Sequence, residues 1–293
     1  MDTAYWLQQL SNGLAAGSIY ALIAVGYSMV YSVLYLINFA HGDLYMFGTF
    51  IALTIIESGA PVWAAIAFAC LAGALLGMVT ERFAYRPVRH ANRIVPMVSA
   101  LGAALVLRSL AQALWGASTK PFPSFLPTGR ITIGSASIGW DSIVILVVSV
   151  VLVALMSLML SRTKVGNATK AVCADIEAAS YMGIDVNRVI VGIYAIAGVL
   201  GVVGGVMFSA YYNATYIGMG LLGTMKAWAA VMIAGVGNIY GALVGGLILG
   251  VVEAFAGAVL GSGYKNGVAL VLIVLILVLK PAGLFGTRMT KRA

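Results

Sequence analysis

Long apolar runs separated by short polar stretches make up most of this sequence. The runs fall at residues 12–37, 44–60, 61–80, 94–115, 143–160, 189–212, 221–237, 239–260 and 266–280. A helix rises about 1.5 Å per residue, so crossing a hydrocarbon core of about 30 Å takes about 20 residues. Most runs are long enough, whereas 44–60 and 266–280 are short. The pattern predicts an all-α, polytopic transmembrane bundle of roughly eight spans, within a range of seven to nine, with broken or re-entrant helices.

The composition supports lipid as the surrounding medium. Of the 293 residues, 62% are hydrophobic and 9% are charged, whereas soluble domains average about 45–50% and about 25%. Because the apolar runs extend along the whole length, we expect a single transmembrane domain, residues 1–293. The net charge of +8 does not indicate nucleic acid, because the basic residues lie between apolar runs and not in one patch. Cys70 and Cys173 are expected to be unpaired.

The basic residues predict an orientation in a bacterial inner membrane. One consistent threading puts twelve of them on one side: Arg82, Arg86, Arg89, Arg93, Arg162, Lys164, Lys170, Arg188, Lys280, Arg288, Lys291 and Arg292. Only Lys120, Arg130 and Lys265 fall on the other side. Cytoplasmic loops carry the excess of Lys and Arg. The loop 161–190 and the C-terminus are therefore expected in the cytoplasm and the loop 116–142 in the periplasm, while the side of the N-terminus stays open.

Motifs for catalysis are weak or missing from the sequence. Residues 218–223 read GMGLLG, but they begin an apolar run and do not follow a strand, as a dinucleotide site requires. No phosphate-loop motif occurs. His41 and His90 lie far apart without Cys or His neighbours, so no metal site is expected. We expect a membrane protein that is not an enzyme, holds no cofactor and does not hydrolyse ATP by itself.

Two polar breaks interrupt the apolar pattern. The first is the stretch 38–43 (Asn-Phe-Ala-His-Gly-Asp), and the second is the stretch 235–241 (Gly-Val-Gly-Asn-Ile-Tyr-Gly). Each is either a solvated turn or unwound backbone at membrane depth that lines a pathway. Gly-interrupted segments in both halves of a chain are typical of a transporter core. Under the pathway interpretation, the candidate substrate-pathway residues are Asn38, His41, Gly42, Gly235, Gly237 and Asn238.

A few ionisable residues stand inside apolar runs. They are Arg108, Lys226 and Glu253, with Glu57 near the end of a run. Ionisable side chains in hydrocarbon are costly unless they pair or face a cavity. Under the predicted threading, Lys226 and Glu253 lie at similar depth. We hypothesise that they form an intramembrane ion pair between adjacent helices.

The polar loop 161–190 is longer than a helix connection needs and is helix-prone around 168–182. It is either a solvated surface helix or a docking element. Its residues 177–179 (Glu-Ala-Ala), with Gly183 after three more residues, resemble the EAA loop of ABC importer permeases, although the usual Leu-Pro ending reads Ala195-Ile196 here. In that family the loop forms a coupling helix that fits a cleft in the cytoplasmic ATPase. The resemblance implies an ATPase-coupling role for these residues: Glu177, Ala178, Ala179 and Gly183.

Three stretches extend this resemblance over nearly the whole chain. Residues 12–50, 174–189 and 225–255 are similar to the LivH type of permease subunit from branched-chain amino acid ABC transporters. The resemblance implies a second, LivM-like permease subunit, two cytoplasmic ATPase subunits and a periplasmic amino acid-binding protein as partners. It also implies import of branched-chain or related amino acids, along a pathway that we expect to be mostly apolar.

Other functions remain open at this point. The chain could be an ABC permease for another small solute, such as urea or amides, or an ion-coupled secondary amino acid transporter. The secondary transporter explains broken helices and buried charges but not the EAA-like loop. An intramembrane enzyme would need paired catalytic residues at depth, which the sequence does not offer.

Overall fold

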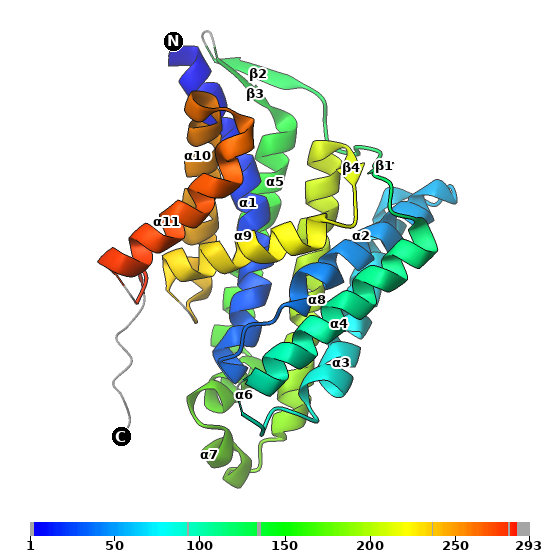
Figure 1. Ribbon diagram of the computed structural model, residues 1–293, viewed down its shortest axis with the longest axis vertical. Helices are drawn as coiled ribbons and strands as arrows, with labels where there is room; N and C mark the ends of the chain where they lie inside the picture. Colours follow the sequence, from blue (N-terminus) through cyan, green and yellow to red (C-terminus); the bar gives the residue numbers. More distant parts are fainter. Residues whose placement is uncertain (1–2, 93, 134–135, 236, 281, 286–293) are drawn as a thin grey trace. The chain divides into compact units, whose positions relative to one another are not determined.

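Helices account for almost all regular structure in the computed structural model, which describes residues 3–92, 94–133, 136–235, 237–280 and 282–285 (Figure 1). Arg93, Arg288, Lys291 and Arg292 lie outside the described residues. The helices are α1 (Thr3–Leu34), α2 (Ala40–Glu57), α3 (Val62–Thr80), the π-helical turn η1 (Glu81–Tyr85), α4 (Ile94–Trp115), α5 (Trp140–Arg162), α6 (Lys164–Ala174), α7 (Ile176–Tyr181), α8 (Val186–Tyr212), α9 (Met219–Ala234), α10 (Ile239–Leu260), the 3-10 turn η2 (Ser262–Tyr264) and α11 (Lys265–Leu279).

Seven of the described helices are long and apolar enough to cross a membrane. They are α1, α3, α4, α5, α8, α10 and α11, the last counted together with η2. The predicted polytopic helical fold is therefore confirmed, with a span count at the lower end of the predicted range. Of the two segments predicted to be short, 266–280 forms the 15-residue helix α11, as predicted, whereas 44–60 forms the 18-residue helix α2, whose first turn carries His41 and Asp43. The 16-residue apolar helix α9 is also shorter than a span.

The chain divides into two compact units, and each is built from separated segments. Unit 1 comprises Met1–Ser28, Pro127–Val153 and Lys226–Ala293, and unit 2 comprises Met29–Leu126 and Ala154–Met225. Three of the four divisions fall inside α1, α5 and α9, and the fourth lies in the connection between α4 and α5.

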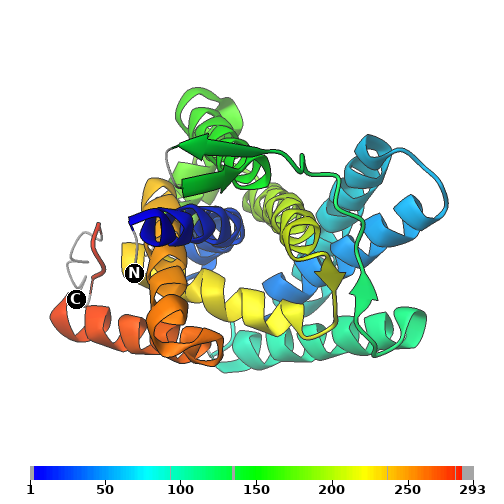
Figure 2. The same cartoon turned by 90° about the horizontal axis from the view of Figure 1, so that it is seen from above.

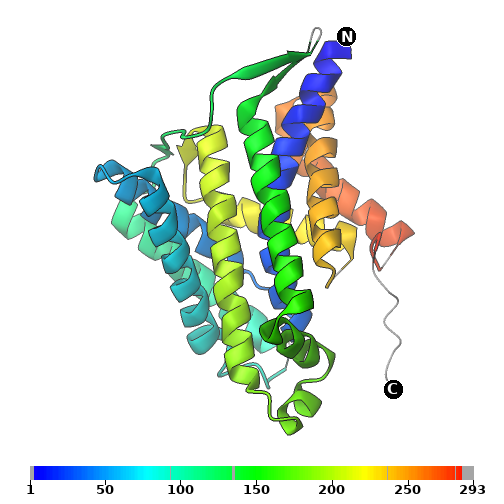
Figure 3. The same ribbon diagram turned by 180° about the vertical axis from the view of Figure 1, so that it is seen from behind.

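Unit 2 is built around α8, which packs along α3 and α2 (Figure 3). Glycines allow the close approach. A Cβ at Gly198 would overlap the carbonyl oxygen of Gly73, and one at Gly77 would overlap that of Tyr194. Lipid gives helices no hydrophobic reason to associate, so close backbone approach at small residues supplies the packing energy instead. The two-residue strands β1 (Lys120–Pro121) and β4 (Ala214–Thr215) pair antiparallel in the same unit.

Unit 1 uses the same device between α1 and α10. A Cβ at Gly17 or Gly250 would overlap backbone atoms of the other helix. The antiparallel hairpin β2 (Arg130–Ile133) and β3 (Ala136–Gly139) leads directly into α5, and it adjoins the first turn of that helix when seen from above (Figure 2). The Trp140 amide donates to the carbonyl oxygen of Gly129 (3.0 Å), which fixes the junction.

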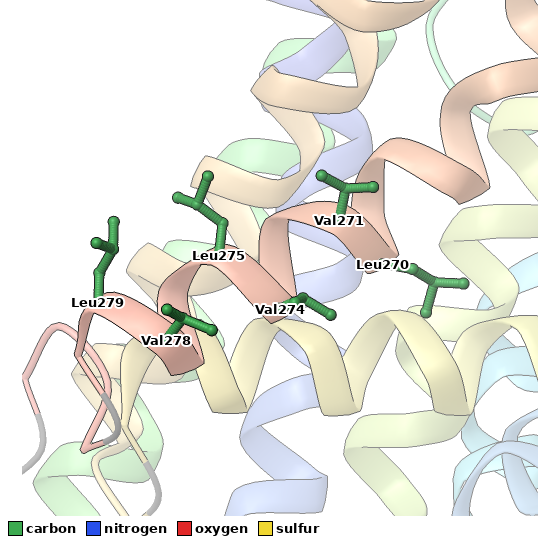
Figure 4. A pocket seen from close by; sticks show the side chains of 6 residues that line it. All are labelled: Leu270, Val271, Val274, Leu275, Val278 and Leu279. Carbon is green, nitrogen blue, oxygen red and sulfur yellow. The ribbon is translucent and has the colours of Figure 1, made fainter.

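One face of α11 is an aliphatic surface. Six residues line an apolar hollow of about 530 Å³: Leu270, Val271, Val274, Leu275, Val278 and Leu279 (Figure 4). All six side chains are exposed. In water such a surface would be costly, whereas acyl chains solvate it without penalty. The face therefore fits a membrane environment.

Candidate functional site: helix breaks, buried ion pairs and the coupling segment

The first helix break lies earlier in the chain than predicted. Helix α1 ends at Leu34, Tyr35 adopts a left-handed backbone (φ 52°), and α2 begins at Ala40. The break is thus 35–39, and the prediction that it covers 38–43 is wrong for residues 40–43, which belong to α2. Asn38 explains the early restart, because its Oδ1 accepts a hydrogen bond from the Ala40 amide (3.1 Å), one of the first amides of the new helix.

The polar residues around this break are buried inside unit 2. Asn38 Oδ1 also accepts from the Tyr85 hydroxyl (3.0 Å), and its Nδ2 has no hydrogen-bond partner among the described residues. His41 is fully buried in the first turn of α2 and packs against Gly201, where a Cβ would lie 3.4 Å from the imidazole. These side chains therefore do not belong to a solvated turn. A role in the substrate pathway stays a prediction.

Gly42 has a packing function. A Cβ at this position would overlap both the carbonyl oxygen of Gly220 and the Thr224 hydroxyl oxygen. Only a glycine lets the first turn of α2 lie directly against α9. The geometry thus assigns Gly42 to helix packing as well as to the buried polar region.

A buried carboxylate follows in the same turn of α2. Asp43 is paired bidentately with Arg108 of α4, with Nε 3.2 Å from Oδ1 and Nη2 3.0 Å from Oδ2. The side chain of Asp43 is 1% exposed and that of Arg108 is 28% exposed. Two parallel N–H···O bonds are the strong geometry for an arginine and a carboxylate. The pair therefore holds α2 and α4 together within unit 2.

Unit 1 has its own buried ion pair. Lys226 Nζ pairs with Glu253 Oε1, and the Tyr20 hydroxyl donates to Glu253 Oε2 (3.0 Å). The ammonium also lies over the Tyr20 ring, 5.1 Å from its centroid. The lysine side chain is 11% exposed and the glutamate side chain is 4% exposed. Three helices (α1, α9 and α10) thus contribute one group each to a satisfied polar cluster.

The second helix break is a capped connection in unit 1. Helix α9 ends at Ala234 and α10 begins at Ile239, with Gly235 (φ 99°) and Gly237 (φ 88°) between them. Asn238 caps α10, because its Oδ1 accepts from the Gly241 amide (3.0 Å). The first break belongs to unit 2, so the six predicted pathway residues fall three in each unit.

The end of α9 is closed by a distant part of the chain. The amides of Leu284 and Phe285 donate to the carbonyl oxygens of Ile233 (2.9 Å) and Ala234 (2.7 Å). The last carbonyls of a helix otherwise lack partners. Helix termination in unit 1 is therefore supported by the segment that follows α11.

The loop 161–190 folds as a two-helix segment, α6 and α7, beside the start of α8 (Figure 1). Asp175 stands between the two helices with an extended backbone, and its Oδ1 accepts from the amides of Glu177 (2.9 Å) and Ala178 (3.0 Å). This side chain caps α7 and ends α6 at the same position. Burial raises the pKa of the neighbouring Cys173 thiol to about 11.

The turn after α7 carries two large hydrophobic side chains into solvent. Tyr181 is 86% exposed and Met182 is 82% exposed. Gly183 follows in a left-handed conformation (φ 80°), which returns the chain towards α8. Glu177 and Ala178 are exposed on α7, whereas Ala179 is buried. Exposed hydrophobic residues on a polar segment are typical of a protein interface.

Comparison with known proteins places this architecture in a family. The family model described as the permease component of the branched-chain amino acid transport system matches residues 9–279. The chain belongs to this permease family. It is 38% identical to the high-affinity branched-chain amino acid transport system permease protein BraD of Pseudomonas aeruginosa, over 96% of both chains. The corresponding LivH proteins of Salmonella typhimurium and Escherichia coli are 36% and 35% identical, again over 96% of each. The resemblance to LivH-type permeases is confirmed.

Some features of this permease were missed by sequence reasoning. Arg108 was recognised as a charge in an apolar run, but its pairing with Asp43, 65 residues away, was not. The signal was partial, because a lone arginine in hydrocarbon requires an acidic partner, but the pattern does not identify Asp43 as that partner. The exposure of Tyr181 and Met182 was also missed, because several other hydrophobic residues of the loop 161–190 lie in the same polar stretch.

Proposed function

We propose that this chain is the membrane permease subunit of an ATP-driven importer that carries branched-chain amino acids across the bacterial inner membrane. One observation carries the proposal: the chain matches BraD and LivH permease proteins over 96% of their length at 35–38% identity. The seven candidate spans and the polar two-helix segment fit that role.

Coupling to ATP hydrolysis would act through α7. ATP is hydrolysed on two separate cytoplasmic ATPase subunits, which contact Glu177, Ala178 and the exposed pair Tyr181 and Met182. A second, LivM-like permease completes the channel, and a periplasmic binding protein delivers the amino acid. The excess of basic residues in the loop 161–190 and at the C-terminus supports a cytoplasmic position for both.

The substrate passes a region where buried charges are few and paired. Asn38 and His41 at the start of α2 offer a buried amide and an imidazole in unit 2. Gly235 and Gly237 supply flexible backbone in unit 1. Few fixed charges are free to hold a zwitterion tightly, so the permease gives weak, transient binding and the delivery protein supplies the affinity.

Reconstitution tests the proposal. Liposomes that contain the permease pair and both ATPases, with binding protein outside and ATP on the ATPase side, should accumulate labelled leucine, and omission of ATP or of this chain should abolish uptake. Uptake by this chain alone along a proton or sodium gradient would replace the proposal with a secondary transporter. Competition by urea or acetamide, but not by isoleucine, would assign the importer to another solute.

A further inference from the structure

A second candidate binding site lies beside the α6–α7 segment of unit 2. A cavity of about 290 Å³ is enclosed by the end of α1, the residues just after η1, and the junction of α6 and α7. Its apolar lining consists of Val33, Leu34, Leu36, Val172 and Ile176. Charged side chains of both signs also line it: Arg89 from the residues after η1, and Asp175 and Glu177 from the junction.

The charges around this cavity lack ionic partners. The Arg89 guanidinium donates from Nε to His90 Nε2 (3.2 Å) and from Nη2 to Asn187 Oδ1 (2.6 Å), and neither acceptor is a carboxylate; Nη1 has no hydrogen-bond partner among the described residues. Within the described part of the chain, no ion pair engages Arg89, Asp175 or Glu177. The arginine and the two carboxylates therefore face one cavity without neutralising each other.

We propose that this cavity binds a zwitterionic aliphatic α-amino acid. The ligand's carboxylate pairs with Arg89, its ammonium group pairs with the carboxylates of Glu177 and Asp175, and its side chain packs against the apolar lining. A guanidinium favours a carboxylate because its N–H groups match the two oxygens. The volume lies at the small end of known ligand pockets, which suits one amino acid.

Occupancy of the cavity regulates import, an inference that rests on the proposed function. Ile176 and Glu177 belong to α7, the helix that couples the permease to its ATPases, whereas Val33 and Leu36 belong to the end of α1 and the break after it. A ligand that bridges them restrains α7. The cavity is on the side where imported leucine accumulates, so it acts as a sensor for product and slows further import.

The test uses the complete importer in liposomes, with the ATPases and ATP in the lumen and the binding protein with labelled leucine outside. Millimolar unlabelled L-leucine in the lumen should lower the initial rate of uptake several-fold. Leucinol, which lacks the carboxylate, and 4-methylpentanoate, which lacks the ammonium group, should have no such effect. Arg89→Gln should relieve the inhibition, whereas Arg82→Gln, an exposed arginine of the same basic region outside the cavity, should leave it intact.

A second cavity variant provides an independent test in case Arg89→Gln does not fold. Leu34→Trp fills the cavity from the end of α1 and should relieve the inhibition in the same way. Normal ATP-driven uptake that lumenal leucine does not slow would overturn the sensor while leaving the proposed function intact. Equal relief by Arg82→Gln, or no relief by either cavity variant, would also overturn it. Absence of ATP-dependent uptake would instead count against the proposed function.

Discussion

The buried ion pair of unit 1 and the α7 turn of unit 2 present opposite problems. Lys226 and Glu253 put two charges among apolar helices, whereas Tyr181 and Met182 put two large hydrophobic side chains on a polar segment. The charged side chains are thus buried among apolar groups, and the hydrophobic side chains are exposed on a polar surface. The first problem is solved inside the chain, by pairing and by the Tyr20 hydroxyl. The second has no internal solution, because both side chains remain exposed.

The ion pair of unit 1 therefore contributes to stability, whereas the exposed residues at the end of α7 are candidates for a functional contact. A charge that is satisfied within the fold contributes to holding helices in place, and its loss should appear as instability. Tyr181 and Met182, which the fold leaves exposed on a polar segment, contribute little to stability and are available to a partner. Substitutions at the two regions should therefore affect different measurements: the free energy of unfolding at the ion pair, and the affinity for a partner at the end of α7.

The largest effect is expected from Lys226→Met. The substitution leaves the Glu253 carboxylate buried with only the Tyr20 hydroxyl as a partner, so unfolding in mixed micelles should be easier by about 3–5 kcal/mol. A denaturant titration of the purified permease measures it. The double variant Lys226→Met/Glu253→Gln should regain most of the loss, because no unpaired charge remains. Equal stability of wild type and single variant would show that the pair holds nothing together.

An asymmetric effect is expected at the ion pair of unit 2. Arg108→Gln leaves Asp43 unpaired and 1% exposed, and should cost about 3 kcal/mol in the same titration. Asp43→Asn leaves Arg108, which is 28% exposed and can reach a polar phase, so roughly 1–2 kcal/mol is expected. If the two variants lose the same amount, exposure does not control the cost of an unpaired charge here.

Replacing Tyr181 and Met182 by alanine should weaken docking without destabilising the fold. Loss of exposed interface side chains costs about 1–2 kcal/mol in association, or about tenfold or more in the affinity for the ATPase subunits. Affinity is measured by titrating ATPase into the permease in nanodiscs. The exposed neighbour Ser180→Ala serves as the matched control and should change neither quantity. A fall in the unfolding free energy would contradict the division between the two regions.

The smallest effect is chemical and leaves transport unchanged. Burial raises the pKa of Cys173 to about 11 from 9.0, so the reactive thiolate is roughly 100-fold scarcer near neutral pH. Maleimide should label Cys173 slowly, with a rate that rises about tenfold per pH unit up to that pKa. A cysteine introduced by Ser180→Cys, in a background without the native cysteines, gives the rate of an exposed thiol. Labelling of Cys173 at the exposed rate would show that the start of α7 is open.

Much of the fold could be predicted because the apolar pattern follows from membrane thickness. The seven spans, the helical character of 161–190 and the break near Asn38 all derive from local composition. The exact bounds of the break could not, because they depend on which backbone amide the Asn38 side chain reaches. The C-terminal end of α9 could not be predicted either, because it depends on Gly235 and on hydrogen bonds from Leu284 and Phe285, some 50 residues away.

The candidate sites could be predicted only in part. The family resemblance singled out Glu177 and Gly183 by their spacing, and charge in an apolar run singled out Lys226 and Glu253. Pairing between Asp43 and Arg108 required the packing of α2 on α4, which no local pattern encodes. The cavity at Arg89 needed three separate segments of chain to be brought together, and single-sequence reasoning cannot do this.

The single residue between α6 and α7 has a mechanical consequence. Asp175 joins the two helices through one extended position, and Gly183 joins α7 to the chain that enters α8. The short helix α7 is thus connected to its neighbouring helices through non-helical backbone at each end. Under the proposed function, an ATPase subunit that moves α7 can change its tilt through rotations at Asp175 and Gly183, so that no backbone hydrogen bond inside α5 or α8 has to break.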